Sequence, residues 1–281
     1  LALLSINRFL GCWSEYDAGL RMERWEGVEI YESGDNKGRV KSAQFIFFET
    51  NEQIPYAVKY LTAAEELYFF SNVNSFMKSL SLGEDICELE NLQRLTVSAY
   101  GLTELPDAME NMKSLRYLDL SSNNFDRIPK VLQKCENLKA LFLLDNQRSG
   151  VTDLSNTVKK DLGGLSAETP ADANGNMKFP EWLLEWNTLD TLRLSVNYLQ
   201  GTLPTDDELL AAGFKAWDPE AAFDETLTEV SLKDSLGTAG VQFFKDNQVP
   251  MVLPDIDFFS INLNRLHGDI PNWLKYHPKL D

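Results

Sequence analysis

Few residues in this chain have the types and spacing needed for chemistry. The two histidines are His267 and His277, and we expect both on the surface, because neither has the spacing of a metal site or of a nucleophile and base pair. Acidic pairs such as Asp206–Asp207 and Asp255–Asp257 could act as acid and base. Such pairs are expected in any chain this acidic, so we predict no catalytic residue.

One segment imitates the start of a calcium-binding loop. Asp172, Asn174 and Asn176 stand at every second position, as the first ligands of a calcium-binding loop do. The glycine, however, is at the fourth rather than the sixth position of the loop, and no glutamate stands at the twelfth. The sequence also contains no phosphate loop, dinucleotide fingerprint or Gly-x-Ser-x-Gly motif. We therefore predict no metal site, no cofactor and a non-enzymatic function.

Charge and cysteine content exclude further classes. The chain has 43 acidic and 26 basic side chains, a formal charge of -17, which disfavours nucleic acid as a partner. The excess of acidic residues is explained by the need to keep a long surface soluble; the alternative explanation is a specific cationic partner. No apolar run is long enough to insert into a membrane. Three cysteines are too few for a disulfide framework, so we expect all three to be small buried side chains.

Binding is better supported than catalysis, because aromatic and charged residues recur at fixed places in a repeated pattern. Exposed groups of this kind on one face indicate an interaction surface. A long loop that covers them is the open alternative. The candidate residues are Tyr68, Phe70, Arg94, Tyr100, Tyr117, Asp119, Phe142 and Arg193.

The pattern that positions these residues is the leucine-rich repeat, as in the segment from Leu115 to Asn123. The base period is 23 to 24 residues, and longer intervals indicate loop insertions near 147–177 and 205–226. The second insertion includes a predicted short helix with acidic residues in its first turn. We predict about eight repeats over 40–281, with a ninth truncated; their first positions are Val40, Ala64, Leu92, Leu115, Leu138, Leu189, Leu227, Ile256 and Leu280.

Each repeat alternates inward leucines with outward residues, as expected of a strand. The predicted fold class is α/β: a right-handed solenoid with a parallel sheet on the concave face, and short helices, 3-10 turns and loops on the convex face. A proline falls nine residues before the next repeat in five places, and it suits the turn into the convex side. These prolines are Pro55, Pro106, Pro129, Pro180 and Pro271.

An inward asparagine recurs five residues beyond the second leucine position. A short amide there can bond backbone groups of its own coil and of the neighbouring coil, so we predict a structural ladder. Tyr100 and Ser235 replace the amide in two repeats, where we expect the ladder to be broken. The ladder residues are Asn72, Asn123, Asn146, Asn197 and Asn264.

Residues 1–39 lack the repeat and resemble the amino-terminal cap of plant-type leucine-rich repeat proteins, through Ala2–Gly11, Trp25–Val28 and Gly38–Val40. Glu23 and Ile30 stand near the places of the family's cap cysteines. We expect an amphipathic helix there to cover the first coil. The segment before Cys12 resembles the end of a bacterial lipoprotein signal, although Asn7 and Arg8 interrupt its apolar run.

The cap cysteines of the plant-type family are missing here, where Glu23 and Ile30 stand instead. This difference and the Gly268–Leu274 pattern together make the chain similar to secreted or surface leucine-rich repeat proteins of gut Bacteroidetes bacteria. The resemblance implies a cell-surface or secreted, extracytoplasmic location and a recognition role. We expect a module that binds a protein or glycan through its concave face. The alternatives are a structural or spacer segment of a larger surface protein and, more weakly, the targeting domain of an enzyme whose catalytic part lies elsewhere. The pattern does not predict an oligomeric state.

Overall fold

The computed structural model describes ten stretches of the chain. Among them, no helix is long and apolar enough to cross a membrane. The described residues are 2–6, 22, 25–46, 54–71, 80–125, 128–146, 179, 181–197, 199–218 and 242–280.

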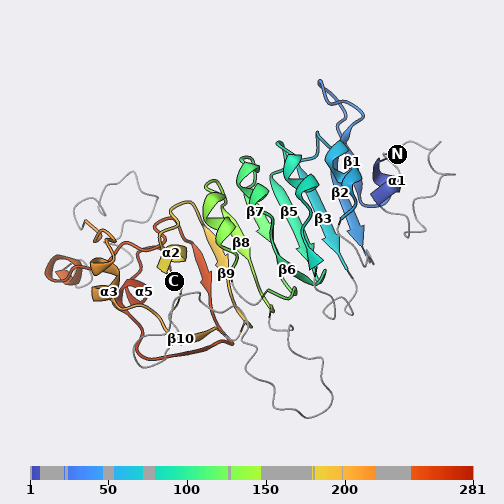
Figure 1. Cartoon of the computed structure of the whole chain (residues 1–281). Helices are drawn as coiled ribbons and strands as arrows, with labels where there is room; N and C mark the ends of the chain where they lie inside the picture. Colours follow the sequence, from blue (N-terminus) through green and yellow to red (C-terminus); the bar gives the residue numbers. More distant parts are fainter. Residues whose placement is uncertain are drawn as a thin grey trace, which may run out of the picture.

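The protein is a leucine-rich repeat solenoid whose strands form one eight-stranded sheet (Figure 1). The first two strands are antiparallel, and every later pair is parallel and in register. The predicted fold class is thereby confirmed. In order, the strands are β1 (Val28–Ile30), β2 (Val40–Ile46), β3 (Glu66–Phe70), β5 (Arg94–Ser98), β7 (Tyr117–Asp119), β8 (Ala140–Phe142), β9 (Thr191–Arg193) and β11 (Phe258–Ser260).

The convex side consists of short helices, most of which follow the predicted prolines. Pro55, Pro106, Pro129 and Pro271 are each the N-cap of the helix that follows, which confirms their predicted role at four of five places. Pro180 lies outside the described residues. The helices are η3 (Tyr56–Tyr60), η5 (Glu84–Glu88), η6 (Asp107–Asn111), η7 (Lys130–Lys134), α2 (Glu181–Leu184), α3 (Asp206–Ala211) and α5 (Asn272–Lys275).

Two small parallel sheets are also present. In the sequence, each of their strands follows a strand of the main sheet and precedes one of these helices. One pairs β4 (Leu80–Ser81) with β6 (Leu102–Glu104), and the other pairs β10 (Gln200–Thr202) with β12 (Arg265–His267). Each forms where a coil leaves its main strand and turns towards the convex side (Figure 1).

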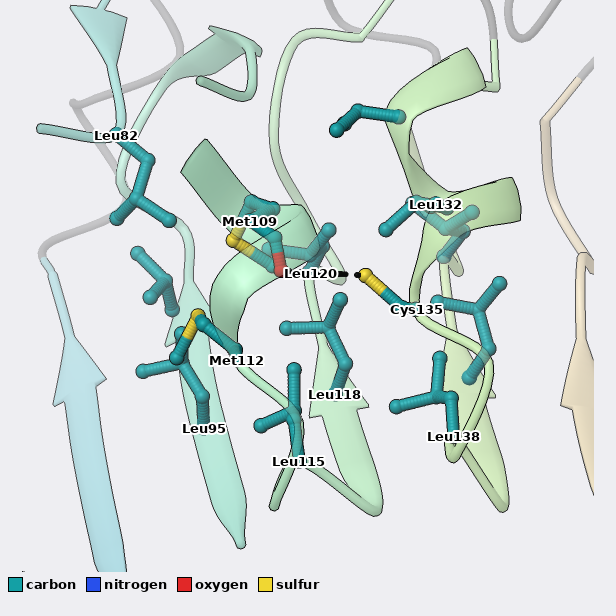
Figure 2. Packing of buried hydrophobic residues seen from close by; sticks show 14 of the residues in the cluster. Leu82, Leu95, Met109, Met112, Leu115, Leu118, Leu120, Leu132, Cys135 and Leu138 are labelled. Carbon is teal, nitrogen blue, oxygen red and sulfur yellow. Dashed lines mark hydrogen bonds between the residues drawn. The ribbon is translucent and has the colours of Figure 1, made fainter. Parts of the chain in front are cut away.

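Equivalent leucines from successive coils stack to form the core. Leu95, Leu118, Leu141 and Leu192 share one register position and are completely buried. Figure 2 shows leucines of neighbouring coils directed towards one another, with the Cys135 thiol directed towards Met109 of the preceding coil. Burying a leucine contributes roughly 1.5–3 kcal/mol, so the stacked rows hold the coils together.

The asparagines join neighbouring coils through buried bonds. Asn123 Oδ1 accepts the backbone N–H groups of Tyr100 and Leu102 at 3.0 and 3.1 Å, while Nδ2 donates to the carbonyls of Val97 and Leu120 at 2.7 and 2.8 Å. Asn197 and Asn264 donate to their own and preceding coils in the same way; Asn72 lies outside the described residues.

The bonds of Asn146 are weaker than those of its equivalents. Its Nδ2 reaches the carbonyls of Leu120 and Leu144 at 3.3 and 3.2 Å, and its buried Oδ1 has no hydrogen-bond partner. The ladder therefore loosens in the coil that precedes the first long insertion.

The repeat predicted at Leu227 does not supply a strand between β9 and β11. Leu227 itself lies outside the described residues, but β9 pairs with β8 on one side and directly with β11 on the other. Asn197 N–H donates to Asn264 Oδ1 at 3.0 Å, so the ladder also passes between these coils without Ser235. Local spacing alone does not reveal which leucine-rich segment pairs in the sheet.

At the amino-terminal end, α1 (Ala2–Ile6) packs against η3. Leu3, Ile6 and Trp25 are buried in the core, as expected of residues that cover the first coil. Cys87 and Cys135 are buried free thiols, and burial raises their pKa to about 12 and about 11 respectively. Cys12 and the calcium-like residues Asp172, Asn174 and Asn176 lie outside the described part of the chain.

His277 corrects a second expectation, because it is buried rather than on the surface. Its side chain is 4% exposed, and Nε2 lies 2.9 Å from the carbonyl oxygen of Val252. Trp217 packs edge-on against the ring at 6.0 Å. Val252 and Trp217 both belong to the long segment between β9 and β11. The spacing of the repeats does not predict where this segment packs, and so it does not predict the burial of His277. His267 is exposed, as expected.

The predicted helix in the second insertion is confirmed as α3. Thr205 and Glu208 form a capping box, with the Thr205 Oγ1 accepting the Glu208 N–H at 3.3 Å. Asp206, considered above as an acid–base candidate, has a structural role: its carboxylate accepts the N–H groups of Trp273 and Asn272 at 2.9 and 3.2 Å.

Candidate functional site

The parallel register places most of the predicted binding residues in two adjacent rows on the concave face. The first row contains Arg94 and Tyr117 at equivalent positions of β5 and β7. The second contains Asp119, Phe142 and Arg193 at equivalent positions of β7, β8 and β9. Because neighbouring strands lie about 4.8 Å apart, side chains in each row are within contact distance.

Five side chains from these rows form a continuous stack, which we call the arginine–aromatic cluster: Arg94, Tyr117, Phe142, Arg193 and Phe258. The Arg94 guanidinium lies over the Tyr117 ring at 3.8 Å, and the Tyr117 and Phe142 rings are 4.8 Å apart. Arg193 lies 5.2 Å from the Phe142 ring and 4.5 Å from that of Phe258. The stack therefore spans five coils, with an arginine on β5 and β9 and an aromatic ring on β7, β8 and β11.

The two arginines differ in their electrostatic surroundings. Arg94 Nε is 4.0 Å from a carboxylate oxygen of Glu66, at a half-exposed position. Arg193 Nε is buried without a hydrogen-bond partner. A buried donor left without an acceptor costs about 1–3 kcal/mol, so Arg193 is the less well satisfied of the two guanidinium groups.

Tyr68 and Phe70 form a second aromatic pair on β3, beside the cluster. Their rings are stacked at 6.4 Å, and Phe70 is 37% exposed. The Tyr68 hydroxyl donates to Glu66 Oε2 at 2.5 Å. Burial, followed by this bond, raises the pKa of Tyr68 to about 12, so the phenol stays protonated and uncharged at neutral pH.

Asp119 and Tyr117 also have defined environments. Asp119 Oδ1 accepts the Ser121 N–H at 2.9 Å, which fixes the carboxylate at the end of β7. Burial raises the pKa of Tyr117, with a smaller contribution in the same direction from the negative charge of Asp119. The Asp119 carboxylate thus lies on a strand between those of the two guanidinium groups, and Glu66 supplies a second carboxylate beside Arg94.

Tyr100 is not part of this surface and is a correction to the predicted site. It is 1% exposed, and its ring lies in the core at the position that asparagine occupies in other coils. A side chain at this position points inward, so replacing the amide by an aromatic ring fills the core rather than extending the binding face.

Phe258 was missing from the predicted set although it completes the cluster. It is 45% exposed and stands opposite Thr191 in the register. The available signal was its position two residues after Ile256, which matches Tyr117 two residues after Leu115. The repeat predicted at Leu227 would place another strand between Phe258 and the other candidates, whereas β9 and β11 pair directly.

Polar groups border the cluster on its β11 side. Ser195 bonds to both Ser260 and Asn262, and Ser260 Oγ donates to Asn262 Oδ1 at 2.8 Å. Within the described stretches, no group of three or more His, Cys, Asp or Glu residues could hold a metal ion. The arrangement can provide stacking, cation–π contacts and hydrogen bonds to a bound partner.

Comparison with known proteins supports the fold. A family model described as "Leucine rich repeat" matches residues 90–147. A structure described as a plant ice-binding protein aligns with 96% of this chain and 80% of its own, with a TM-score of 0.51 and 22% identity. At this level of identity, the similarity shows a shared fold.

Two curated relatives match over short regions. An Arabidopsis thaliana protein described as a disease resistance protein is 35% identical over 77 residues, 26% of this chain. A Dictyostelium discoideum protein described as an inactive serine/threonine-protein kinase is 27% identical over 139 residues, 49% of this chain. The matches span 5% of the length of each relative.

Proposed function

We propose that this protein is a non-enzymatic recognition module that binds a protein or glycan partner through the concave face of its solenoid. The observation that carries the proposal is the arginine–aromatic cluster, which is half-exposed over five coils and contains an unsatisfied arginine donor. Aromatic and arginine side chains contribute most of the energy in many interfaces, so their combination on one face suits a docking surface.

The site also provides the polarity needed for specificity. Asp119 is on β7, a strand that lies between those of Arg94 and Arg193, and the serine and asparagine groups on the β11 side offer further hydrogen bonds. A partner with an extended polar surface could stack on the rings and pair with both charges. A spacer segment would need no such face, and this distinction separates the two main hypotheses.

The test is a binding screen against extracellular proteins and glycans with the parent and a triple variant, Tyr68→Ala, Tyr117→Ala and Phe142→Ala. Any partner of the concave face should bind the variant at least tenfold more weakly, because the central aromatic contacts are lost. The matched control is Tyr56→Ala with Tyr60→Ala, since these rings are 63% and 64% exposed on the convex helix η3.

Equal binding by the parent and the concave variant would overturn the assignment of this face. If no partner binds the parent in the screen, the recognition hypothesis gives way to the spacer hypothesis. We further propose an extracytoplasmic location at the cell surface or as a secreted protein. Protease protection of this chain in intact cells, compared with lysed cells, would contradict that location.

A further inference from the structure

A small cavity lies on the convex side, away from the arginine–aromatic cluster. It is open to solvent and lies between the end of η7 and the segment that contains α2, and its volume is about 190 Å³. The residues that line it are Gln133, Glu136, Trp182, Glu185, Trp186 and Asn187. Two tryptophans, two carboxylates and two amides therefore meet around one space.

One of the two tryptophans, Trp182, is not fully used in packing the core. Trp182 and Trp273 both stand two residues after a proline of the repeat. Trp273 is 1% exposed, and its Nε1 donates to the carbonyl of Pro204 at 2.8 Å. Trp182 is instead only partly buried and contributes to the wall of the cavity. Trp182, which occupies the same repeat position as the buried Trp273, is therefore available to a ligand.

The geometry of the pair suits a positively charged group. The rings of Trp182 and Trp186 are 6.4 Å apart and tilted by 41°, so one cation can lie within about 6 Å of both ring centroids, the range of cation–π attraction. Trp186 is 8% exposed and is therefore held firmly by the surrounding core.

The charge of the cavity favours the same class of ligand. Among the described residues that line it, Glu136 and Glu185 are acidic and none is lysine or arginine. The whole chain carries a formal charge of -17, which raises the concentration of cations near its surface. A neutral sugar could stack on tryptophan, but it would not require two carboxylates beside the rings.

We propose that this cavity binds an organic cation, in which the charged nitrogen lies against Trp182 and Trp186 and is neutralised by Glu136 and Glu185. A quaternary ammonium compound and the side chain of a partner's lysine or arginine share this chemistry. The site is separate from the concave face, so its failure would leave the proposed function unaffected.

The test is a titration of the whole protein at low salt, followed by tryptophan fluorescence and calorimetry. The probes are choline, its neutral carbon analogue 3,3-dimethyl-1-butanol, Nα-acetyl-lysine amide and Nα-acetyl-arginine amide. We expect saturable binding of at least one cation and at least tenfold weaker binding of the neutral analogue. Preference for choline or for the amino-acid amides distinguishes a free ligand from a protein side chain.

Variants locate the site. Glu136→Gln with Glu185→Gln should weaken binding at least tenfold, whereas Glu90→Gln with Asp269→Asn removes the same charge at exposed positions elsewhere and should leave binding unchanged. Trp182→Phe keeps a weaker aromatic face and should retain more affinity than Trp182→Ala. Equal affinity for the neutral analogue, preference for methyl glucoside over every cation, or no binding at all would overturn the proposal.

Discussion

Asn123 and Asn146 occupy the same position in successive coils, yet their side chains bind their surroundings differently. Asn123 satisfies two backbone N–H groups and two carbonyls within 3.1 Å, whereas Asn146 makes two bonds of 3.2 and 3.3 Å and leaves its Oδ1 without a partner. A single residue type can therefore contribute unequally to a repeated structure.

Asn123→Ala should lower the free energy of unfolding by about 3 kcal/mol, because it leaves buried backbone groups unpaired at about 1–3 kcal/mol each. Asn146→Ala should cost only about 1 kcal/mol, since fewer and longer bonds are lost. Urea denaturation of both variants measures this difference. Equal losses would mean that the amide bonds do not determine the strength of the ladder.

His277 should make stability depend on pH. Burial lowers its pKa in the folded state below the ordinary value of about 6.5. Above pH 6.5 the ring is neutral in both states, and its contribution is fully present. As the pH falls below 6.5, the unfolded chain takes up the proton first, so stability is lost until the folded pKa is reached.

We therefore expect the parent to lose more stability between pH 7 and pH 5 than His277→Gln, in which this titration is absent. The comparison with the variant removes the contribution of the many carboxylates, which titrate in both proteins. Thermal melts across this interval measure the effect. Parallel pH profiles for the two proteins would contradict it.

Among the elements, the turn that leaves each concave strand has one recurring conformation. The residue before the ladder position has a positive φ in five coils, although none of these residues is glycine: Ala99, Ser122, Asp145, Val196 and Leu263. This left-handed conformation is uncommon for residues other than glycine and costs of order 1–3 kcal/mol for a bulky side chain. Packing of the coils evidently imposes the turn.

Leu263→Asn should raise the free energy of unfolding by about 1 kcal/mol, because asparagine tolerates a positive φ better than leucine. Leu263 has a φ of 55° and is 70% exposed, so little packing is lost. Leu263→Val should have the opposite effect, since a branched β-carbon is least compatible with this conformation. Chemical denaturation of the pair provides the measurement, and a lower stability of Leu263→Asn would argue against strain.

The elements also show what the sequence could predict. The strands and the proline turns follow from local patterns of about 23 residues, because a coil contacts mainly its neighbours. The segment at Leu227 has the same local pattern, but pairing in the sheet depends on which segments meet across an insertion. The burial of His277 and the role of Phe258 depend on the same long-range pairing, and so they could not be deduced from spacing alone.

Considered as a whole, the molecule carries a large excess of negative charge on an elongated surface. The ion pairs of the described residues, such as Lys134–Glu110 at 2.7 Å, join mainly half-exposed side chains. Such pairs contribute little, whereas repulsion among many like charges acts over the whole surface and is reduced by salt. Electrostatics should therefore oppose folding at low ionic strength.

Raising NaCl from 0.01 M to 0.5 M at pH 7 should increase the melting temperature, by about 2–4 °C for each kcal/mol of repulsion that is screened. The increase should shrink as the pH approaches the isoelectric point of about 4.6, where the net charge vanishes. Calorimetry at two pH values tests this. A melting temperature that falls with salt at pH 7 would show that the ion pairs outweigh the repulsion.

The direct pairing of β9 with β11 has a consequence for the order of folding. Paired residues are 23 apart between β7 and β8, such as Tyr117 and Ala140, but 67 apart between Thr191 and Phe258. Closing the longer loop costs about 1 kcal/mol more in chain entropy and makes this contact slower to form. Arg193 and Phe258 meet across this junction, so the arginine–aromatic cluster is complete only after this long-range contact has formed.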